Sequence, residues 1–410
     1  MKFSPKVKIT TIQNLKFIIH NCFCDSIYSM NPHRITFILL FLFLASLPSN
    51  LWAKKHHTPT ATPTETFTDT PTATATFTPI PYTGPKIYSF DAMWGSKGIG
   101  NDQLNAPEGI DIAPSGKMVI ADTGNSRIVV WDSEGKPVTV LGSFGTRADW
   151  RDAPQFNHPA GVFVAPSKKT YVADTQNHRI VVLDEKGLVL STWGAQGNSP
   201  GQFNLPRAVA KDHYNKIWVL DSGNSRIQIF SGLGEYLSGW GAFGDPTSNS
   251  NNAFMNQPLG FTLNYIDQAL IADTGNFHFQ VLNSGGVPVT LEGWYGEGPF
   301  QFKEPGGIVI AKSGMIAVTD GTTGRVVFFN NRFEFIGQWS AKDDIVTPNY
   351  NPHFRGIACD AENRLYLTDL QNSQIVRIKP MKAPEPPAPP TMTPTPLDNN
   401  PYGGNGFPIR

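Results

Sequence analysis

The side chains best suited to chemistry stand at the start of each unit of a repeated pattern, Pro-x-Gly. Glu108, Arg207 and Arg355 occupy its middle position, and Glu304 stands directly before a proline. Carboxylates and guanidinium groups pair with charged groups of ligands, so these four residues predict a polar pocket for a small anionic or zwitterionic ligand. The place before the proline, or before the residue that replaces it in the last unit, also holds three further ligand-binding candidates: His158, Gln257 and His353.

The wider search for catalytic motifs yields no candidate. The chain has no phosphate-binding loop, no His-Glu-x-x-His zinc motif and no closely spaced pair of cysteines in the repeated region. Its three cysteines stand at positions 22, 24 and 359, so a disulfide framework is excluded there. We therefore name no catalytic residue and expect a binding function, with an enzyme as the alternative.

One turn sequence recurs six times and organises the chain. Its aspartates stand at positions 122, 174, 221, 273, 320 and 369, in steps of 52, 47, 52, 47 and 49 residues. Aspartate and asparagine side chains bond to nearby backbone groups, Gly124 tolerates a positive φ angle, and Arg127 can pair with Asp122. Two histidines in the copies, His178 and His278, are expected to be surface or turn residues.

We interpret this turn motif as structural, because a catalytic group would not be needed six times. Its positions are Asp122, Asn125, Arg127, Asp174, Asn177, Arg179, Asp221, Asn224, Arg226, Asp273, Asn276, Asp320, Arg325, Asp369 and Asn372.

The spacing of the turns predicts the fold class. A period near 50 residues with strand-like patterning is typical of a β-propeller built from four-stranded blades. In the first unit we expect strands over 110–113, 118–121, 128–131 and 138–142. Six turns then predict an all-β, six-bladed propeller with antiparallel blades over residues 86–380.

The ends of the fourth strands predict how the ring closes. Each is expected to end in an aromatic residue followed by a small one: Phe144-Gly145, Trp193-Gly194, Trp240-Gly241, Trp294-Tyr295-Gly296, Trp339-Ser340 and Trp94-Gly95. Residues 86–94 read as a fourth strand with no three before it, whereas the last unit stops after its third strand. We therefore expect the N-terminal strand to complete the sixth blade, which removes an open sheet edge.

The Pro-x-Gly openings are expected to ring the mouth of the central channel, on the same face as the aspartate turns, since antiparallel strands reverse at each turn. Ligands commonly bind where such elements converge. His158, Gln257 and His353 come from blades two, four and six, about 120° apart in a six-bladed ring. A divalent metal held by these three is the weaker alternative to the polar pocket, and we expect no cofactor.

The recurring Pro-x-Gly opening and Ala-Asp-x-x-Asn-x-Arg-Ile turn resemble the NHL-repeat family of β-propellers. The resemblance covers residues 86–380 and implies the six-bladed fold and a role in binding. Peptidyl-hydroxyglycine amidating lyases also resemble this propeller and use metal-binding histidines that follow the opening proline; here only Pro352-His353 has that order. A secreted, metal-dependent lyase or lactone hydrolase is therefore the alternative function.

The charge of the propeller region argues against nucleic acid as a partner. Some NHL propellers bind single-stranded RNA through a basic face. Residues 85–380 contain 24 lysines and arginines against 28 aspartates and glutamates. A mildly acidic domain is a poor binder of a phosphate backbone. We expect a monomer that binds a protein, peptide or glycan.

The two ends of the chain differ from the repeats in composition. An apolar run over residues 35–47, preceded by Arg34 and ended by Pro48, is typical of a signal peptide, with cleavage expected after Ala53. A start at Met30 would make residues 1–29 a mis-assigned extension; an uncleaved anchor is the alternative. Residues 54–85 form a Thr/Pro-rich linker and 381–410 a similar tail. We expect a bacterial protein that is secreted, periplasmic or on the cell surface.

Overall fold

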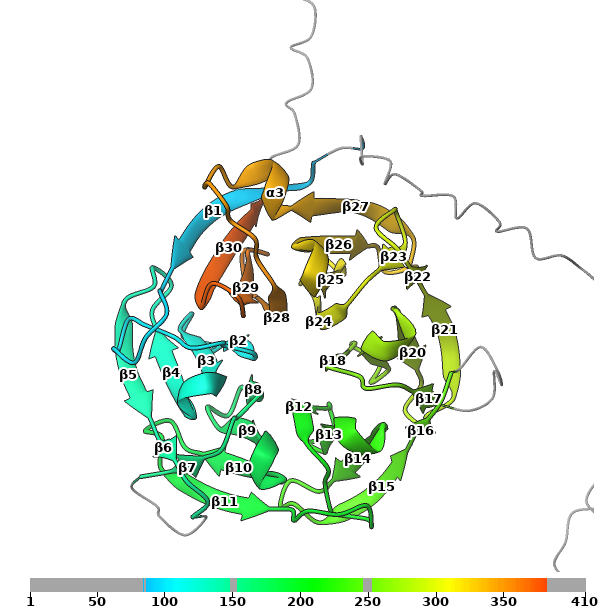
Figure 1. Cartoon of the computed structure of the whole chain (residues 1–410). Coiled ribbons are helices and arrows are strands. Elements are labelled where there is room, and N and C mark those ends of the chain that lie inside the picture. Colours follow the sequence, from blue (N-terminus) through cyan, green and yellow to red (C-terminus); the bar gives the residue numbers. More distant parts are fainter. Residues whose placement is uncertain (1–83, 85, 148–152, 246–252, 382–410) are drawn as a thin grey trace, which may run out of the picture. The chain divides into compact units, whose positions relative to one another are not determined.

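The computed structural model describes residues 84, 86–147, 153–245 and 253–381. These residues form six four-stranded antiparallel sheets arranged as blades of a ring (Figure 1), so the predicted six-bladed β-propeller is confirmed. The expected signal peptide and nearly all of the linker and tail lie outside the described residues. Among the described helices, none is long and apolar enough to cross a membrane.

The blades follow one another along the chain. Within a blade the four strands lie side by side, from the innermost strand near the axis to the outermost (Figure 1). Blade one consists of β2 (Ile110–Ile112), β3 (Met118–Asp122), β4 (Arg127–Trp131) and β5 (Pro137–Leu141). Blade two consists of β8 (Gly161–Val164), β9 (Thr170–Asp174), β10 (Arg179–Leu183) and β11 (Val189–Trp193). Blade three consists of β12 (Pro206–Lys211), β13 (Ile217–Asp221), β14 (Arg226–Phe230) and β15 (Tyr236–Trp240).

The second half of the ring repeats this order. Blade four consists of β18 (Gly260–Leu263), β19 (Ala269–Asp273), β20 (His278–Leu282) and β21 (Pro288–Glu292). Blade five consists of β24 (Pro305–Ile310), β25 (Ile316–Asp320), β26 (Arg325–Phe329) and β27 (Phe335–Ser340), followed by the short helix α3 (Ala341–Asp344). Blade six consists of β28 (Phe354–Cys359), β29 (Leu365–Asp369), β30 (Gln374–Pro380) and β1 (Tyr88–Trp94).

Two of the predicted fourth-strand ends are wrong. Ile128 pairs with Leu141, and Phe279 pairs with Glu292, at the place where Ile180 pairs with Trp193. The fourth strands of blades one and four therefore end in a leucine and a glutamate. The aromatic residues expected there belong to short parallel pairs in the inter-blade loops: β6 (Ser143–Phe144) with β7 (Gln155–Phe156), and β22 (Trp294–Tyr295) with β23 (Gln301–Phe302). A third such pair joins β16 (Ala242–Phe243) to β17 (Phe254–Met255).

The ring closes through β1, as the sequence predicted. β1 lies antiparallel to β30, with Tyr88 opposite Pro380 and Trp94 opposite Ile375 (Figure 1). The Tyr88 hydroxyl donates to the carbonyl of Asn363 at 2.7 Å, and its ring stacks on Phe328 of blade five. The N-terminal strand thus joins the last blade and packs on the one before it.

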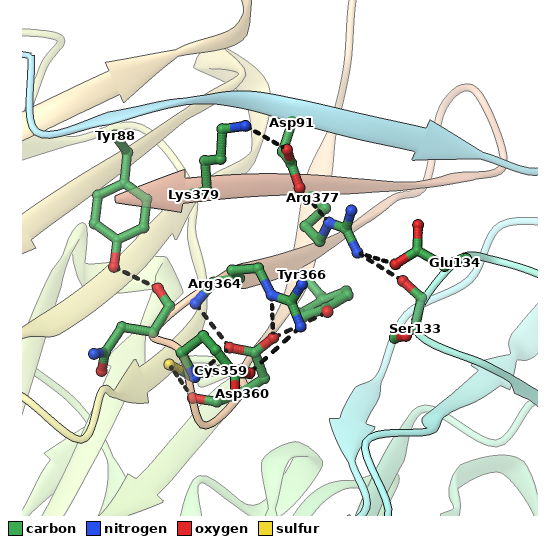
Figure 2. Close-up of polar contacts among 12 residues, drawn as sticks. Tyr88, Asp91, Ser133, Glu134, Cys359, Asp360, Arg364, Tyr366, Arg377 and Lys379 are labelled. Atoms are coloured by element: carbon green, nitrogen blue, oxygen red, sulfur yellow. Dashed lines mark hydrogen bonds and ion pairs between the residues drawn. The ribbon is translucent and has the colours of Figure 1, made fainter. Parts of the chain in front are cut away.

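A bulge in β1 carries the polar part of the closure. The register shifts between Phe90 and Ala92, and Asp91 forms ion pairs with Arg377 at 2.5 Å and Lys379 at 2.8 Å (Figure 2). The Arg377 guanidinium lies 4.8 Å from the centre of the Trp94 ring and donates to the carbonyl of Ser133 at 2.7 Å. Because Ser133 belongs to blade one, this arginine connects the first and last blades.

The apolar core lies mainly in six seams, a seam being the contact surface between two neighbouring blades. In the seam of blades one and two, for example, Val119 and Ile128 pack with Val162, Val172 and Val181. Most second and third strands are buried along their whole length, because each is covered by a blade on both faces.

Candidate functional site

Each turn motif is a buried network centred on its aspartate. Asp122 is fully buried, and its Oδ2 accepts hydrogen bonds from Arg127 Nε at 2.6 Å and Asn125 Nδ2 at 2.8 Å. Its Oδ1 accepts the backbone N–H of Asn105 at 2.6 Å. Burial raises the pKa of Asp122 despite these donors. The same contacts recur around Asp174 and Asp221 in blades two and three.

The arginine of the motif also holds the inter-blade loop. Arg127 donates through Nη1 to the carbonyl of Ile99 and through Nη2 to that of Gly100, both at 2.7 Å. The left-handed residue of this turn is Ser126, with φ 54°, and Gly124 does not use its tolerance of a positive φ angle. Position 124 needs glycine for a different reason: a Cβ there would lie 2.6 Å from the side chain of Asn105.

Two copies of the motif lack the arginine. In blade four His278 takes its place, with Nε2 3.2 Å from Asp273 Oδ2. Because His278 is buried in β20, the expectation of a surface or turn residue is wrong for it, whereas His178 does lie in its turn. In blade six the Tyr350 hydroxyl donates to Asp369 Oδ2 at 2.9 Å.

The glycines of the Pro-x-Gly openings set the width of the central channel. A Cβ on Gly161 would lie 2.2 Å from the carbonyl oxygen of Arg207, and one on Gly356 would lie 2.2 Å from that of Glu108. These two close approaches therefore require a residue without a side chain. The approach brings the six middle residues to the wall of one cavity of about 100 Å³: Glu108, Ala160, Arg207, Leu259, Gly306 and Arg355.

Charged groups from four blades meet at this channel mouth, which we define as Glu108, Arg207, Glu304, His353 and Arg355. Arg207 of blade three forms an ion pair with Glu108 of blade one. Their side chains span blade two, whose residue at this level is alanine. Glu304 Oε1 lies 3.1 Å from His353 Nε2 and 3.3 Å from Arg355 Nη2.

Arg355 is the least satisfied member of the channel mouth. Its side chain is 17% exposed, and its Nε is buried without a hydrogen-bond acceptor among the described residues. Burial and the nearby Arg207 lower the pKa of Arg355, while Glu108 and Glu304 act in the opposite direction. For Glu304, burial alone would raise the pKa, but His353 and Arg355 hold it below its ordinary value. The arrangement favours an added anionic group beside Arg355.

The other two sequence candidates lie apart from this cluster. His158 and Gln257 are exposed and left-handed, with φ 49° and 47°. His158 Nδ1 lies 2.9 Å from the side chain of Asn157, and among the described residues no hydrogen bond or ion pair joins any two of His158, Gln257 and His353. No group of three or more His, Cys, Asp or Glu side chains in the described ranges is arranged to hold a metal ion.

Glu304 and His353 differ from their counterparts in backbone hydrogen bonding. In blade two the N–H that donates to Asp174 belongs to Asn157, one residue before His158. In blade five the N–H of Glu304 donates to the turn aspartate together with that of Lys303, and in blade six the N–H of His353 donates to it. The Glu304 side chain reaches Arg355 and the His353 side chain reaches Glu304, which the sequence pattern alone did not indicate.

Two further groups with potential reactivity are held in structural roles. Residues 197–201, Gly-Asn-Ser-Pro-Gly, spell a pattern found around hydrolase nucleophiles, but they lie in a loop before β12, where the Ser199 carbonyl accepts Arg226 Nη2 at 3.1 Å. Burial raises the pKa of the Cys359 thiol to about 12, so the nucleophilic thiolate is suppressed.

No protein-family model matches the chain, and no curated protein matches it either. Solved structures do share its fold. A Bacteroides thetaiotaomicron protein of unknown function is 15% identical, with a TM-score of 0.54 over 72% of this chain and 76% of that one. A gluconolactonase from Xanthomonas campestris is 14% identical, with a TM-score of 0.51 over 72% and 96%.

A virginiamycin B lyase from Staphylococcus aureus is 14% identical over 69% of this chain and 82% of its own, with a TM-score of 0.46. At such identities the likeness concerns the fold alone, and the six-bladed β-propeller serves many unrelated functions.

Proposed function

We propose that this chain is an exported propeller of NHL type that acts as a binding module, holding a carboxylate of a protein, peptide or glycan at the channel mouth. The observation that carries the proposal is Arg355, a largely buried guanidinium whose Nε has no acceptor among the described residues. The adjoining cavity, of about 100 Å³, admits one small group, so the rest of the ligand would lie on the surrounding face. The apolar run over residues 35–47 supports export.

Calorimetry with paired ligands tests this role. Peptides ending in a free carboxylate should bind and their amidated forms should not, and uronic-acid oligosaccharides should be preferred over neutral ones. Replacing Arg355 by Met should abolish the preference. Arg332→Met is the matched control, because Arg332 is exposed in the turn between β26 and β27. Equal binding of both peptide forms, or unchanged binding by Arg355→Met, would contradict the proposal.

The alternative, a secreted metal-dependent lyase or lactone hydrolase, is supported by likeness of fold, since the solved structures that resemble the chain include a gluconolactonase. Elemental analysis of the purified protein separates the two functions. A stoichiometric divalent metal that is lost in a His158→Ala, His353→Ala double variant would favour the enzyme and count against a simple binding module.

A further inference from the structure

The six seams can be compared at the end of the fourth strand, where the residue type differs between blades. Four of the six blades place a tryptophan there: Trp94, Trp193, Trp240 and Trp339. The first three indoles cover a glycine in the turn between the third and fourth strands of the next blade. A Cβ added to Gly135, Gly234 or Gly286 would lie 2.2, 2.7 or 2.3 Å from the indole that covers it.

In the seam between blades four and five, an aromatic side chain from the turn of blade five takes the place of the indole. Its fourth strand ends in Glu292, but the glycine of the next turn is replaced by Phe333, which takes a left-handed φ of 66°. Phe333 packs in a cluster with Phe300 and Phe335, whose ring centres lie 5.3 Å apart. Aromatic rings therefore fill this seam even without a tryptophan.

The seam between blades one and two has neither replacement. Leu141 ends the fourth strand, and the facing turn residue is Gly187, where an added Cβ would lie 2.4 Å from the leucine Cδ2. A cavity of about 350 Å³ lies beside this contact, lined by Val119, Val130 and Val164. It is within the usual size range of small-molecule sites, about 300–1,000 Å³.

The entrance of this cavity combines an exposed apolar residue with free positive charge. Val138 lines it and is 47% exposed. Lys168 is engaged by Glu185 at 2.9 Å, and Asp184 Oδ1 accepts two backbone N–H groups of its own turn. The remaining cations on the rim, Lys117 and Lys186, have no ion pair among the described residues. An apolar wall with unpaired ammonium groups at its rim is complementary to an amphiphilic anion.

We propose that the seam between blades one and two binds a small aromatic carboxylate. The ring lies in the apolar cavity beside Leu141, the residue that stands where three other seams have an indole over the facing glycine, and the carboxylate pairs with Lys117 or Lys186. The site is separate from the channel mouth, shares no residue with it, and does not depend on the binding function proposed there.

Calorimetry of the full chain with indole-3-acetate tests the site, because this probe carries both the ring and the carboxylate. Leu141→Trp supplies the ring from the protein itself, so it should weaken binding at least about tenfold and raise the melting temperature. The matched control is Leu237→Trp, which adds an indole at an exposed leucine of β15. If Leu141→Trp does not fold, Val138→Trp at the exposed entrance replaces it.

Further variants separate this site from the channel mouth. Lys117→Gln with Lys186→Gln should weaken binding of indole-3-acetate by about three- to tenfold and leave neutral indole unaffected. Arg355→Met should leave the affinity for indole-3-acetate unchanged. The proposal is overturned if wild-type protein does not bind the probe at millimolar concentration, if Leu141→Trp binds it as wild type does, or if Arg355→Met alone abolishes binding.

Discussion

The ring of aspartate turns and the channel mouth are built from the same six units, yet they differ in what they repeat. In the turns a fully buried aspartate recurs in all six blades and is bonded to its neighbours in the motif. At the mouth the residue type varies around the ring, and the charged side chains stay partly exposed. Residues that recur in every blade are those that each blade needs in order to fold. A position whose residue type varies around the ring is where the protein can become specific for a ligand.

Substitutions in the two regions should differ most in their effect on the free energy of unfolding. Asp174→Ala leaves the buried guanidinium of Arg179 without its carboxylate, and we expect it to lower the free energy of unfolding by about 3–5 kcal/mol. Glu108→Gln at the channel mouth should change it by less than about 1 kcal/mol. Urea unfolding of both variants measures this, and equal losses would refute the contrast between the two regions.

Asp111, on the innermost strand of blade one, sharpens the contrast, because it forms no ion pair with any other described residue. Asp111 of β2 accepts backbone N–H groups of Val164 at 2.7 Å and Ile112 at 2.8 Å, and burial raises its pKa to about 6. The folded protein thus favours the protonated acid, so its stabilising contribution is full below about pH 4 and is lost as the pH rises through 6. Asp111→Asn does not titrate, and its amide can accept only one of the two N–H groups, so the comparison concerns the change with pH. Relative to this variant, wild-type protein should lose about 1–3 kcal/mol of stability as the pH rises through this window, measured by urea unfolding. Parallel pH dependences of the two proteins would contradict the assignment.

The incomplete turn of blade four offers a test in the stabilising direction. In blade three Arg226 and Gln228 bond to the same aspartate, at 2.7 and 3.1 Å, so an arginine fits beside a glutamine. His278→Arg should therefore restore the contacts to Asp273 and to the loop, raising the free energy of unfolding by about 1 kcal/mol. His178→Arg in blade two is the control, with no gain expected, and a loss in His278→Arg would show that the two turns are not equivalent.

The smallest effect is expected from the acid titration of the channel mouth. The pKa of Glu304 is lowered in the folded protein, so its contribution is present above about pH 4.5 and is lost as the pH falls through the lowered value. Between about pH 5 and 3 wild-type protein should lose more stability than Glu304→Gln, by less than about 1 kcal/mol because the site is partly exposed to solvent. Parallel pH series of thermal unfolding measure this, and identical slopes would contradict it.

The sequence predicted what repeats. The six aspartates gave the blade number, and the unmatched strand over residues 86–94 predicted the closure that β1 makes with β30. The Pro-x-Gly pattern located the middle residues of the channel mouth, because glycine allows the close approach of inner strands in five blades, with Ala208 at that place in blade three. The contribution of Glu304 and His353 depends on how their backbone N–H groups bond to the turn aspartates, which the pattern does not show.

The ends of the fourth strands in blades one and four were predicted wrongly, because the aromatic-small residue pattern was given more weight than the distance from the turn aspartate. Phe144-Gly145 and Trp294-Tyr295-Gly296 look like the other strand ends but follow them in the loop. Trp193, Trp240 and Trp339 each stand 19 residues after their own turn aspartate. The same distance from Asp122 and Asp273 gives Leu141 and Glu292, so this spacing alone would have identified both strand ends.

The pairing of β1 with β30 also determines how the ring would respond to mechanical force. The chain enters and leaves at the same end of this pair, where the N–H of Met381 donates to the carbonyl of Ile87 at 3.0 Å. A load applied between the two ends would pull directly across the first of these hydrogen bonds and then open the others one after another, instead of shearing all of them together. When it is stretched from both ends, the propeller would therefore open at low force, one hydrogen bond after another. When it is tethered by one end alone, no force would act across the β1–β30 pair.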